Sequence, residues 1–92
     1  MVSEKLVVKN PSGIHARPAS RFVSAANKFE SKLTIIKDGK AINGKSILGV
    51  LGAAITCGSE VEFILEGSDE QEALQALVAL VDSGLGESFN GE

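Results

Sequence analysis

Hydrophobic positions along the chain change period several times, and the changes predict strands that alternate with helices. Short apolar runs and apolar residues at every second position are typical of strands, whereas a spacing of three or four residues is typical of a helix. Strands are predicted over residues 5–9, 33–37, 40–43 and 60–66. Helices are predicted over residues 16–28 and 47–55, with a third that starts after Ser68.

The strand over residues 60–66 has the most regular pattern, in which Val61, Phe63 and Leu65 alternate with mostly acidic positions. Strands 33–37 and 40–43 are joined by Asp38-Gly39. This dipeptide is typical of a two-residue hairpin, because both turn residues must take a positive φ. The two strands are therefore expected to pair antiparallel.

The first and third helices are predicted to be amphipathic. The first carries an apolar face opposite a polar stripe of residues spaced three or four apart, namely Arg17, Arg21, Ser24 and Lys28. The third is expected to open with a capping box from Ser68 to Gln71. It is expected to bury the stripe Leu74, Leu77, Val78 and Val81, and to stop at Gly84.

The second helix differs because its sequence, Ile-Leu-Gly-Val-Leu-Gly-Ala-Ala-Ile, is apolar on every side. Ser46 is well placed as its N-cap. Val50 and Ala54 are expected to face inward, which leaves Ile47, Leu48 and Leu51 partly exposed. Such a patch is typical of a surface that docks another protein, although deeper burial of the whole helix remains an alternative.

The predicted order βαββαβα, with one hairpin and helices at the other links, favours an α+β fold. An antiparallel sheet with helices packed on one face would satisfy this order. The 92 residues suit a single domain, which we expect over residues 1–88, followed by a short tail over residues 89–92.

Composition narrows the chemistry of the chain. A single cysteine, Cys57, excludes an internal disulfide and gives no ligand set for a metal cluster. No charged-then-apolar signal opens the sequence, and no apolar run approaches the roughly 20 residues that span a bilayer. We therefore expect a cytoplasmic protein without membrane insertion, metal or cofactor.

Charge is divided between the two halves of the chain. Residues 1–46 hold all nine Lys and Arg against three acids, a net charge of +6, and residues 47–92 hold nine acids and no basic residue, a net charge of −9. The basic residues are spread along several elements, and the chain has no Tyr or Trp on which bases could stack. These features argue against direct binding of nucleic acid and favour a phosphate or an acidic partner protein.

The only histidine, His15, falls where a loop ends and the first helix begins. Pro18 fits the first turn of that helix, where a missing N–H costs little. One interpretation of His15 is a capping or surface residue without chemistry. The other is a nucleophile whose ring nitrogen accepts a phosphoryl group. The backbone N–H groups of Ala16 and Arg17 and the Arg17 guanidinium would then stabilise the charge of the product.

Two motifs identify a family with this pattern. Gly13-Ile14-His15-Ala16-Arg17-Pro18-Ala19, followed by Lys45-Ser46-Ile47 and Gly49-Val50, resembles HPr, the phosphocarrier of the bacterial phosphoenolpyruvate–sugar phosphotransferase system. The resemblance covers almost the whole chain. It implies an open-faced β-sandwich, in which a four-stranded antiparallel sheet carries three helices on one face.

The resemblance also implies a function and partners. His15 would take a phosphoryl group from phosphorylated enzyme I and pass it to sugar-specific enzyme IIA proteins. Ser46 would be the regulatory site of an ATP-dependent HPr kinase/phosphorylase, and the serine-phosphorylated form would act as corepressor for a catabolite-control transcription factor. Docking is expected to involve Ser20, Arg21, Ile47, Leu48 and Leu51. The protein would be a monomeric relay and not a turnover enzyme.

Some features depart from the family pattern or leave alternatives open. Some family members carry lysine where this chain has Ser24 or Asn27, and Arg21 and Lys28 could replace those basic contacts. One alternative is a regulatory HPr-like module that acts through Ser46 alone, and another is a phosphocarrier of a nitrogen-regulatory relay. A histidine-dependent phosphatase would need an acid side chain to work with its histidine and a cleft for its substrate, and the sequence gives no sign of either.

Overall fold

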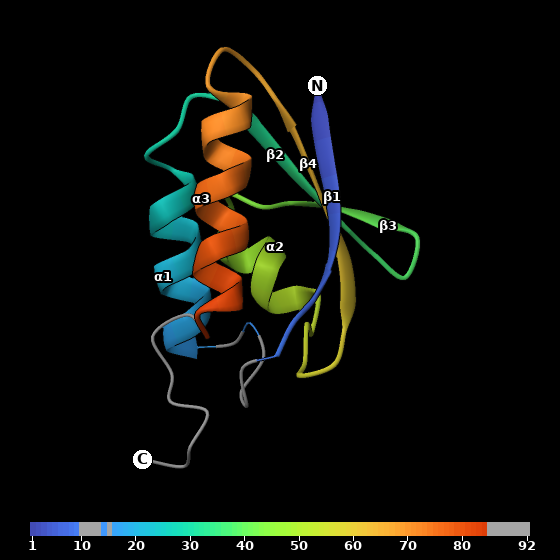
Figure 1. Ribbon diagram of the computed structural model, residues 1–92. Coiled ribbons are helices and arrows are strands. Elements are labelled where there is room, and N and C mark those ends of the chain that lie inside the picture. Colours follow the sequence, from blue (N-terminus) through green and yellow to red (C-terminus); the bar gives the residue numbers. More distant parts are fainter. Residues whose placement is uncertain (10–13, 15, 85–92) are drawn as a thin grey trace.

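Seven elements follow one another as βαββαβα in the computed structural model, which describes residues 1–9, 14 and 16–84. They are β1 (Val2–Val7), α1 (Ala16–Ala26), β2 (Lys32–Lys37), β3 (Lys40–Asn43), α2 (Ile47–Gly52), β4 (Glu60–Glu66) and α3 (Glu70–Asp82). The strands form one antiparallel sheet in the order β1-β4-β2-β3. The predicted fold is confirmed, since the helices cover one face of this sheet (Figure 1).

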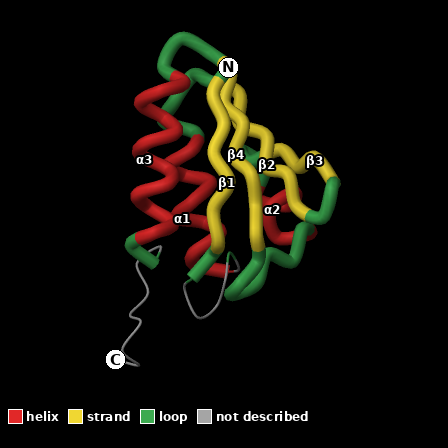
Figure 2. The backbone as a smooth tube through the Cα atoms, turned by 45° about the vertical axis from the view of Figure 1, so that its right-hand side comes forward, coloured by secondary structure: helices red, strands yellow, loops and turns green. Residues whose placement is uncertain are grey.

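The helices divide that face between them. α3 packs against β1 and β4, whereas α2 lies against β3 and contacts α1 (Figure 2). The predicted alternation of β4 is confirmed, because Val61, Phe63 and Leu65 are buried and Glu60 and Glu66 are exposed.

The core between sheet and helices is centred on two aromatic rings. Phe22 of α1 and Phe63 of β4 are fully buried, with ring centroids 5.4 Å apart and planes inclined by 49°. Burial of each such side chain contributes about 1.5–3 kcal/mol. An inclined aromatic pair adds about 0.5–1.5 kcal/mol. This contact fixes α1, and with it the start of that helix, against the central strand.

The hairpin between β2 and β3 forms at the predicted turn. Asp38 has φ 53° and Gly39 has φ 77°, so both turn residues are left-handed, and Lys37 pairs with Lys40 across the turn. These angles match the right-handed twist of the strands that the turn joins.

Strand β1 starts earlier than predicted and ends earlier. Of the predicted strand 5–9 only residues 5–7 lie in β1, because β4 offers partners from Leu65 to Glu60, which pair with Val2 to Val7. Val8 leaves the ladder but stays buried, and its backbone bonds Ser59 and Gly58. The pairing of β1 thus depends on the partner strand, which its own sequence does not reveal.

Two helices are shorter than predicted. α1 ends at Ala26, where the next residues close tighter i→i−3 turns and the Asn27 side chain donates to the Val23 carbonyl. α2 ends at Gly52 because Ala54 takes φ 52° and cannot continue a helix. Ala54 is exposed, so its predicted inward position was wrong.

The predicted capping box of α3 is also wrong. The helix follows Asp69, and the Ser68 hydroxyl donates instead to the Glu30 carboxylate at 3.3 Å. Glu70 reaches back and accepts the Gly67 N–H at 3.1 Å. The predicted stop is confirmed, since Gly84 takes φ 89° just after the helix. Within residues 1–9, 14 and 16–84, no helix is long and apolar enough to cross a membrane.

Candidate functional site

Helix α1 begins where a buried backbone contact joins two distant segments. The Ile14 N–H donates to the Ile55 carbonyl at 2.8 Å, and both side chains are 1% exposed. α1 then starts at Ala16. His15, the residue between them in sequence, lies outside the described residues, as do the predicted turn residues Pro11 and Gly13. The structure therefore describes the residues on either side of the predicted nucleophile, Ile14 and Ala16.

The first turns of α1 favour an anion. This helix has no acidic residue in its first turn, so its own side chains leave the positive end of its dipole uncompensated. The predicted polar stripe is exposed at all four positions, Arg17, Arg21, Ser24 and Lys28, and Ser20 beside it is exposed as well. Guanidinium groups and free helix N–H groups are the donors that phosphate oxygens accept best.

Ser46 caps α2 as the sequence predicted. Its hydroxyl accepts the Gly49 N–H at 3.1 Å, and its carbonyl accepts the Val50 N–H at 2.9 Å. The backbone of Ser46 is extended, with φ −106° and ψ 119°, as is usual for a cap. Ser46 is half-buried, and the bond that its hydroxyl accepts at the helix start is partly shielded from solvent.

The loop before Ser46 is tied to the end of α1 by two polar side chains whose contacts sequence reasoning missed. Asn27 Nδ2 donates to the Lys45 carbonyl at 3.2 Å, and Lys45 Nζ donates to the Phe29 carbonyl at 2.6 Å. Both partners are backbone carbonyls far away in sequence. Hydrophobic periodicity carries no signal for such contacts, and they emerge only once α1 and α2 are packed.

The predicted apolar patch on α2 is largely present. Leu48 is 79% exposed, Ile47 is 38% exposed and Leu51 is half-buried, whereas Val50 is completely buried. The alternative of deeper burial of the whole helix is wrong, because only one side of this short helix enters the core. Adjacent exposed apolar side chains of this kind mark a candidate docking surface.

A shallow groove of about 370 Å³ joins this patch to α1, and we call it the α1/α2 groove. It is lined by Ser20, Val23, Ser24, Asn27, Lys28 and Ile47. The structure thus brings together two predicted docking residues, Ser20 and Ile47, that lie 27 positions apart in sequence. It does not bring Arg21 into the same groove, although Arg21 is exposed on α1.

Metal ligation has no candidate in the described part of the chain, where no three His, Cys, Asp or Glu side chains gather. Cys57 is exposed, and its thiol donates to the Lys9 carbonyl at 3.5 Å.

A family model described as the PTS HPr component phosphorylation site matches residues 2–83. The chain belongs to the HPr family. It is 49% identical over 82 residues to the HPr-like protein Crh of Halalkalibacterium halodurans, covering 89% of this chain and 98% of that protein. It is 46% identical over 80 residues to the phosphocarrier protein HPr of Treponema pallidum, covering 87% and 91% of the two chains.

Solved structures agree with this membership. The crystal structure of HPr-C-His from Thermoanaerobacter tengcongensis superposes with a TM-score of 0.94 at 43% identity, covering 97% of this chain and all of that one. HPr is a phosphocarrier of the phosphotransferase system, so this chain has the fold and family of a phosphoryl relay.

Proposed function

We propose that the chain accepts a phosphoryl group on His15 from phosphorylated enzyme I and passes it to sugar-specific enzyme IIA proteins. The observation that carries this proposal is the sequence position of the only histidine, directly before the acid-free first turn of α1 and inside the segment matched by the family model. We expect a monomeric cytoplasmic relay that needs no cofactor.

The proposed step is a simple displacement at phosphorus. The lone pair of the neutral His15 imidazole forms the new N–P bond while the bond between phosphorus and the donor breaks. The product carries about −1.5 to −2 charges, by analogy with other phosphorylated side chains. The backbone N–H groups of Ala16 and Arg17 and the Arg17 guanidinium are positioned in sequence to stabilise it. A carrier needs reversible transfer, for which a nucleophile and anion-binding donors suffice.

Phosphoenolpyruvate and enzyme I test this proposal directly. The wild-type chain should take up one phosphoryl group that is acid-labile and base-stable, and His15→Ala should take up none while remaining folded. Because the chain has a single histidine, persistence of that acid-labile group in His15→Ala would refute the assignment.

Partner docking is proposed to use the α1/α2 groove and the apolar patch beside it. Ser20 and Ile47 line the groove, and Leu48 is 79% exposed next to it. Arg21 and Leu51 extend the surface on the two helices. This combination of apolar and basic side chains would suit an acidic face of enzyme I or enzyme IIA.

Ser46 is proposed as a regulatory site for an ATP-dependent HPr kinase/phosphorylase. Phosphorylation would place a dianion at the start of α2, where the N–H of Gly49 already points at the serine oxygen. It would also place this charge beside Ile47, Leu48 and Leu51, so docking on that patch would be hindered by repulsion and desolvation. The serine-phosphorylated form would then act as corepressor for a catabolite-control transcription factor. ATP and the kinase should label the wild type but not Ser46→Ala.

A regulatory module that acts only through Ser46 is the second candidate, and the HPr-like Crh relatives favour it. It predicts labelling by ATP and the kinase without labelling by phosphoenolpyruvate and enzyme I. A nitrogen-branch phosphocarrier would instead accept phosphoryl on His15 but fail to pass it to a sugar-specific enzyme IIA.

A further inference from the structure

We propose that Lys37 is a positioning residue for phosphoryl acceptance at His15. Its ammonium group holds the turn that follows α2, and this turn holds the backbone just before His15. The inference rests on the proposed function, because it names a residue that would support that same site from another element.

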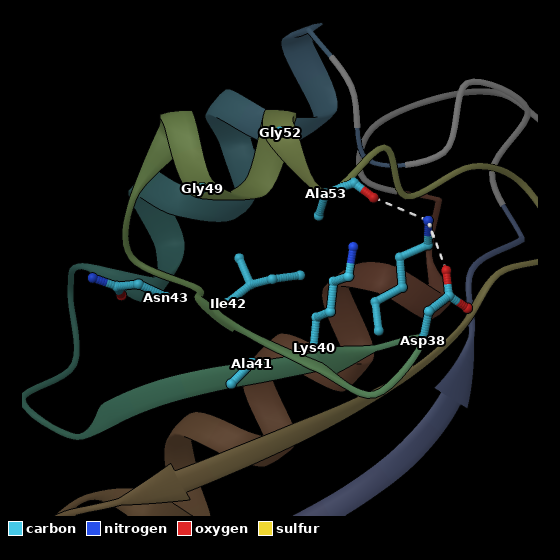
Figure 3. A pocket seen from close by; sticks show the side chains of 9 residues that line it. Asp38, Lys40, Ala41, Ile42, Asn43, Gly49, Gly52 and Ala53 are labelled. Atoms are coloured by element: carbon cyan, nitrogen blue, oxygen red, sulfur yellow. Dashed lines mark hydrogen bonds and ion pairs between the residues drawn. The ribbon is translucent and has the colours of Figure 1, made fainter.

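Lys37 makes two hydrogen bonds that converge on the end of α2. Its Nζ donates to the Ala53 carbonyl at 2.9 Å and to the Ala54 carbonyl at 3.0 Å. The dashed lines in Figure 3 mark the bond to Ala53 and an ion pair with Asp38, in which the two charged atoms are 3.5 Å apart. The Lys37 side chain is only 17% exposed, whereas Asp38 is 79% exposed. The bond to the Ala53 carbonyl is partly buried and is the best shielded of these contacts, whereas the bond to the Ala54 carbonyl is exposed.

Lys37 provides hydrogen-bond donors and a positive charge at the C-terminal end of α2. The last carbonyls of a helix lack intrahelical donors, and a cation near them also interacts favourably with the helix dipole. α2 has no basic residue in its own last turn. Lys37 supplies the cation from β2, which is paired on both sides with β3 and β4 and is therefore a rigid support.

The turn that Lys37 holds is strained. Ala54 takes φ 52°, a left-handed conformation that brings the Cβ of an alanine too close to the following carbonyl oxygen. A groove of about 500 Å³ lies between β3 and α2, and a Cβ added at Gly52 would meet nothing within 4 Å (Figure 3). The end of α2 is thus loosely packed on this side. Polar bonds across the groove replace the apolar packing that usually fixes a turn.

The strained turn leads directly to the site. Ile55 follows Ala54, and its carbonyl accepts the Ile14 N–H at 2.8 Å. His15 follows Ile14, and α1 begins at Ala16. A shift of the Ala53–Ala54 turn would therefore move the backbone that precedes the nucleophile. Displacements of about 1 Å can slow a positioned reaction by as much as a hundredfold.

Three variants of the hairpin test the proposal in single-turnover transfer from phosphorylated enzyme I. We expect Lys37→Met to lower the maximal rate about tenfold, with little change in the enzyme I concentration at half-saturation. Lys37→Arg should restore most of the rate, since it keeps the cation. Lys40→Met is the matched control, because Lys40 pairs with Lys37 across the turn but its ammonium bonds no described residue. It should stay within twofold of wild type.

A remote variant separates positioning from stability. Ser31→Ala removes a hydroxyl that bonds Asp69 at the opposite end of the sheet, so it should destabilise the fold without touching the turn. Hydrogen exchange of the Ile14 amide should quicken in Lys37→Met and stay slow in Ser31→Ala, at a temperature where both are folded.

Several results would overturn the inference. An unchanged rate in Lys37→Met, or an equal slowing in Lys37→Met and Ser31→Ala, would overturn it while wild-type labelling keeps the proposed function. A wild-type chain that accepts no phosphoryl group would overturn both.

Discussion

Helices α1 and α3 begin at opposite ends of the helical layer, and they differ in the charge placed at their starts (Figure 1). α3 follows Asp69 and carries Glu70 and Glu72 in its first turn, whereas the first turn of α1 holds no acidic residue. The chain thus neutralises the positive end of one helix with its own carboxylates. The first turn of α1 has no such carboxylate, and under the proposed function the phosphoryl group would supply the negative charge there.

The carboxylates at the start of α3 also hold neighbouring segments in place. Asp69 accepts the backbone N–H groups of Glu30 and Ser31, each at 2.9 Å, and the Ser31 hydroxyl. The pKa of Asp69 is lowered first by the hydroxyl of Ser31 and then by the N–H of Glu30. The pKa of Glu70 is lowered in the same way, first by the N-terminal ammonium of Met1 and then by the N–H of Gly67.

The contacts described at the α1 end are of a different kind. The segment there is held by the backbone bond between Ile14 and Ile55 and by the Lys37 ammonium on the turn beside it. A carboxylate enters only indirectly, because Asp38 forms an ion pair with the Lys37 ammonium at 3.5 Å, while the backbone itself is held by that ammonium and by the Ile55 carbonyl. Under the proposed function, the groups that bond the backbone beside His15 would be an ammonium and other backbone groups, whereas carboxylates bond the backbone at the far end of the helical layer.

The largest effect is expected when the first turn of α1 receives an acidic residue like those in the first turn of α3. Arg17→Glu adds an acid to the first turn and removes the guanidinium, so we expect transfer from enzyme I to slow by about a hundredfold or more. Arg17→Ala, which only removes the cation, should slow it about tenfold. Lys32→Glu makes the same charge change at an exposed site at the far end of β2 and serves as the control. Equal rates in Arg17→Glu and Lys32→Glu would remove Arg17 from the site.

Asp69→Asn tests the role of the carboxylate at the start of α3. It should lower the free energy of unfolding at neutral pH and leave the rate of phosphoryl transfer from enzyme I unchanged. The folded pKa of Asp69 lies below its unfolded value, so its stabilisation is present above about pH 4 and is lost as the pH falls through the folded pKa. The stability difference between wild type and Asp69→Asn should therefore narrow from pH 7 to pH 3 in urea unfolding. A difference that stays constant with pH would contradict the role given to the carboxylate.

Two substitutions of Ser46 separate the effect of the helix cap on stability from the effect of negative charge on enzyme I binding. Ser46→Ala loses the bond from the Gly49 N–H and should cost about 1 kcal/mol of stability, with enzyme I affinity kept. Ser46→Asp should retain the cap and the stability, yet bind enzyme I more weakly because its charge lies beside Leu48. Urea unfolding and titration calorimetry measure the two effects. If Ser46→Asp binds as tightly as wild type, charge at this position does not control docking.

The smallest expected effect concerns the strained turn. Ala54→Gly should stabilise the fold by about 0.5–1 kcal/mol, because glycine adopts a positive φ without steric cost. Ala53→Gly is the matched control one residue earlier, where φ is −75° and the added freedom should destabilise. A loss of stability in Ala54→Gly would mean that the left-handed conformation is not a source of strain.

The sequence predicts most of the fold because the fold uses local signals. The alternation in β4, the Asp38-Gly39 turn, the cap at Ser46 and the stop at Gly84 are all confirmed. Each of these depends on residues only a few positions apart. The two motifs around His15 and Ser46 also led to the correct family.

The errors arise where a distant partner decides the structure. Ser68 does not open a capping box, because its hydroxyl donates to the carboxylate of Glu30, 38 positions earlier. The sequence around Lys37 indicates only a lysine at the end of a strand, but its ammonium donates to the Ala53 carbonyl at the end of α2. Ala54 follows a helical pattern, but the bridge from Ile55 to Ile14 requires a sharp turn there. Neither periodicity nor propensity contains these pairings.

The chemical shifts of backbone amides in the phosphorylated chain test the central claim most directly. After labelling by phosphoenolpyruvate and enzyme I, the amide resonances of Ala16 and Arg17 should shift the most, because their N–H groups would face the new anion at the start of α1. The amides of Glu70 and Gln71, at the acidic start of α3, should hardly move. Equal changes at both helix starts, or none at Ala16 and Arg17, would contradict the account.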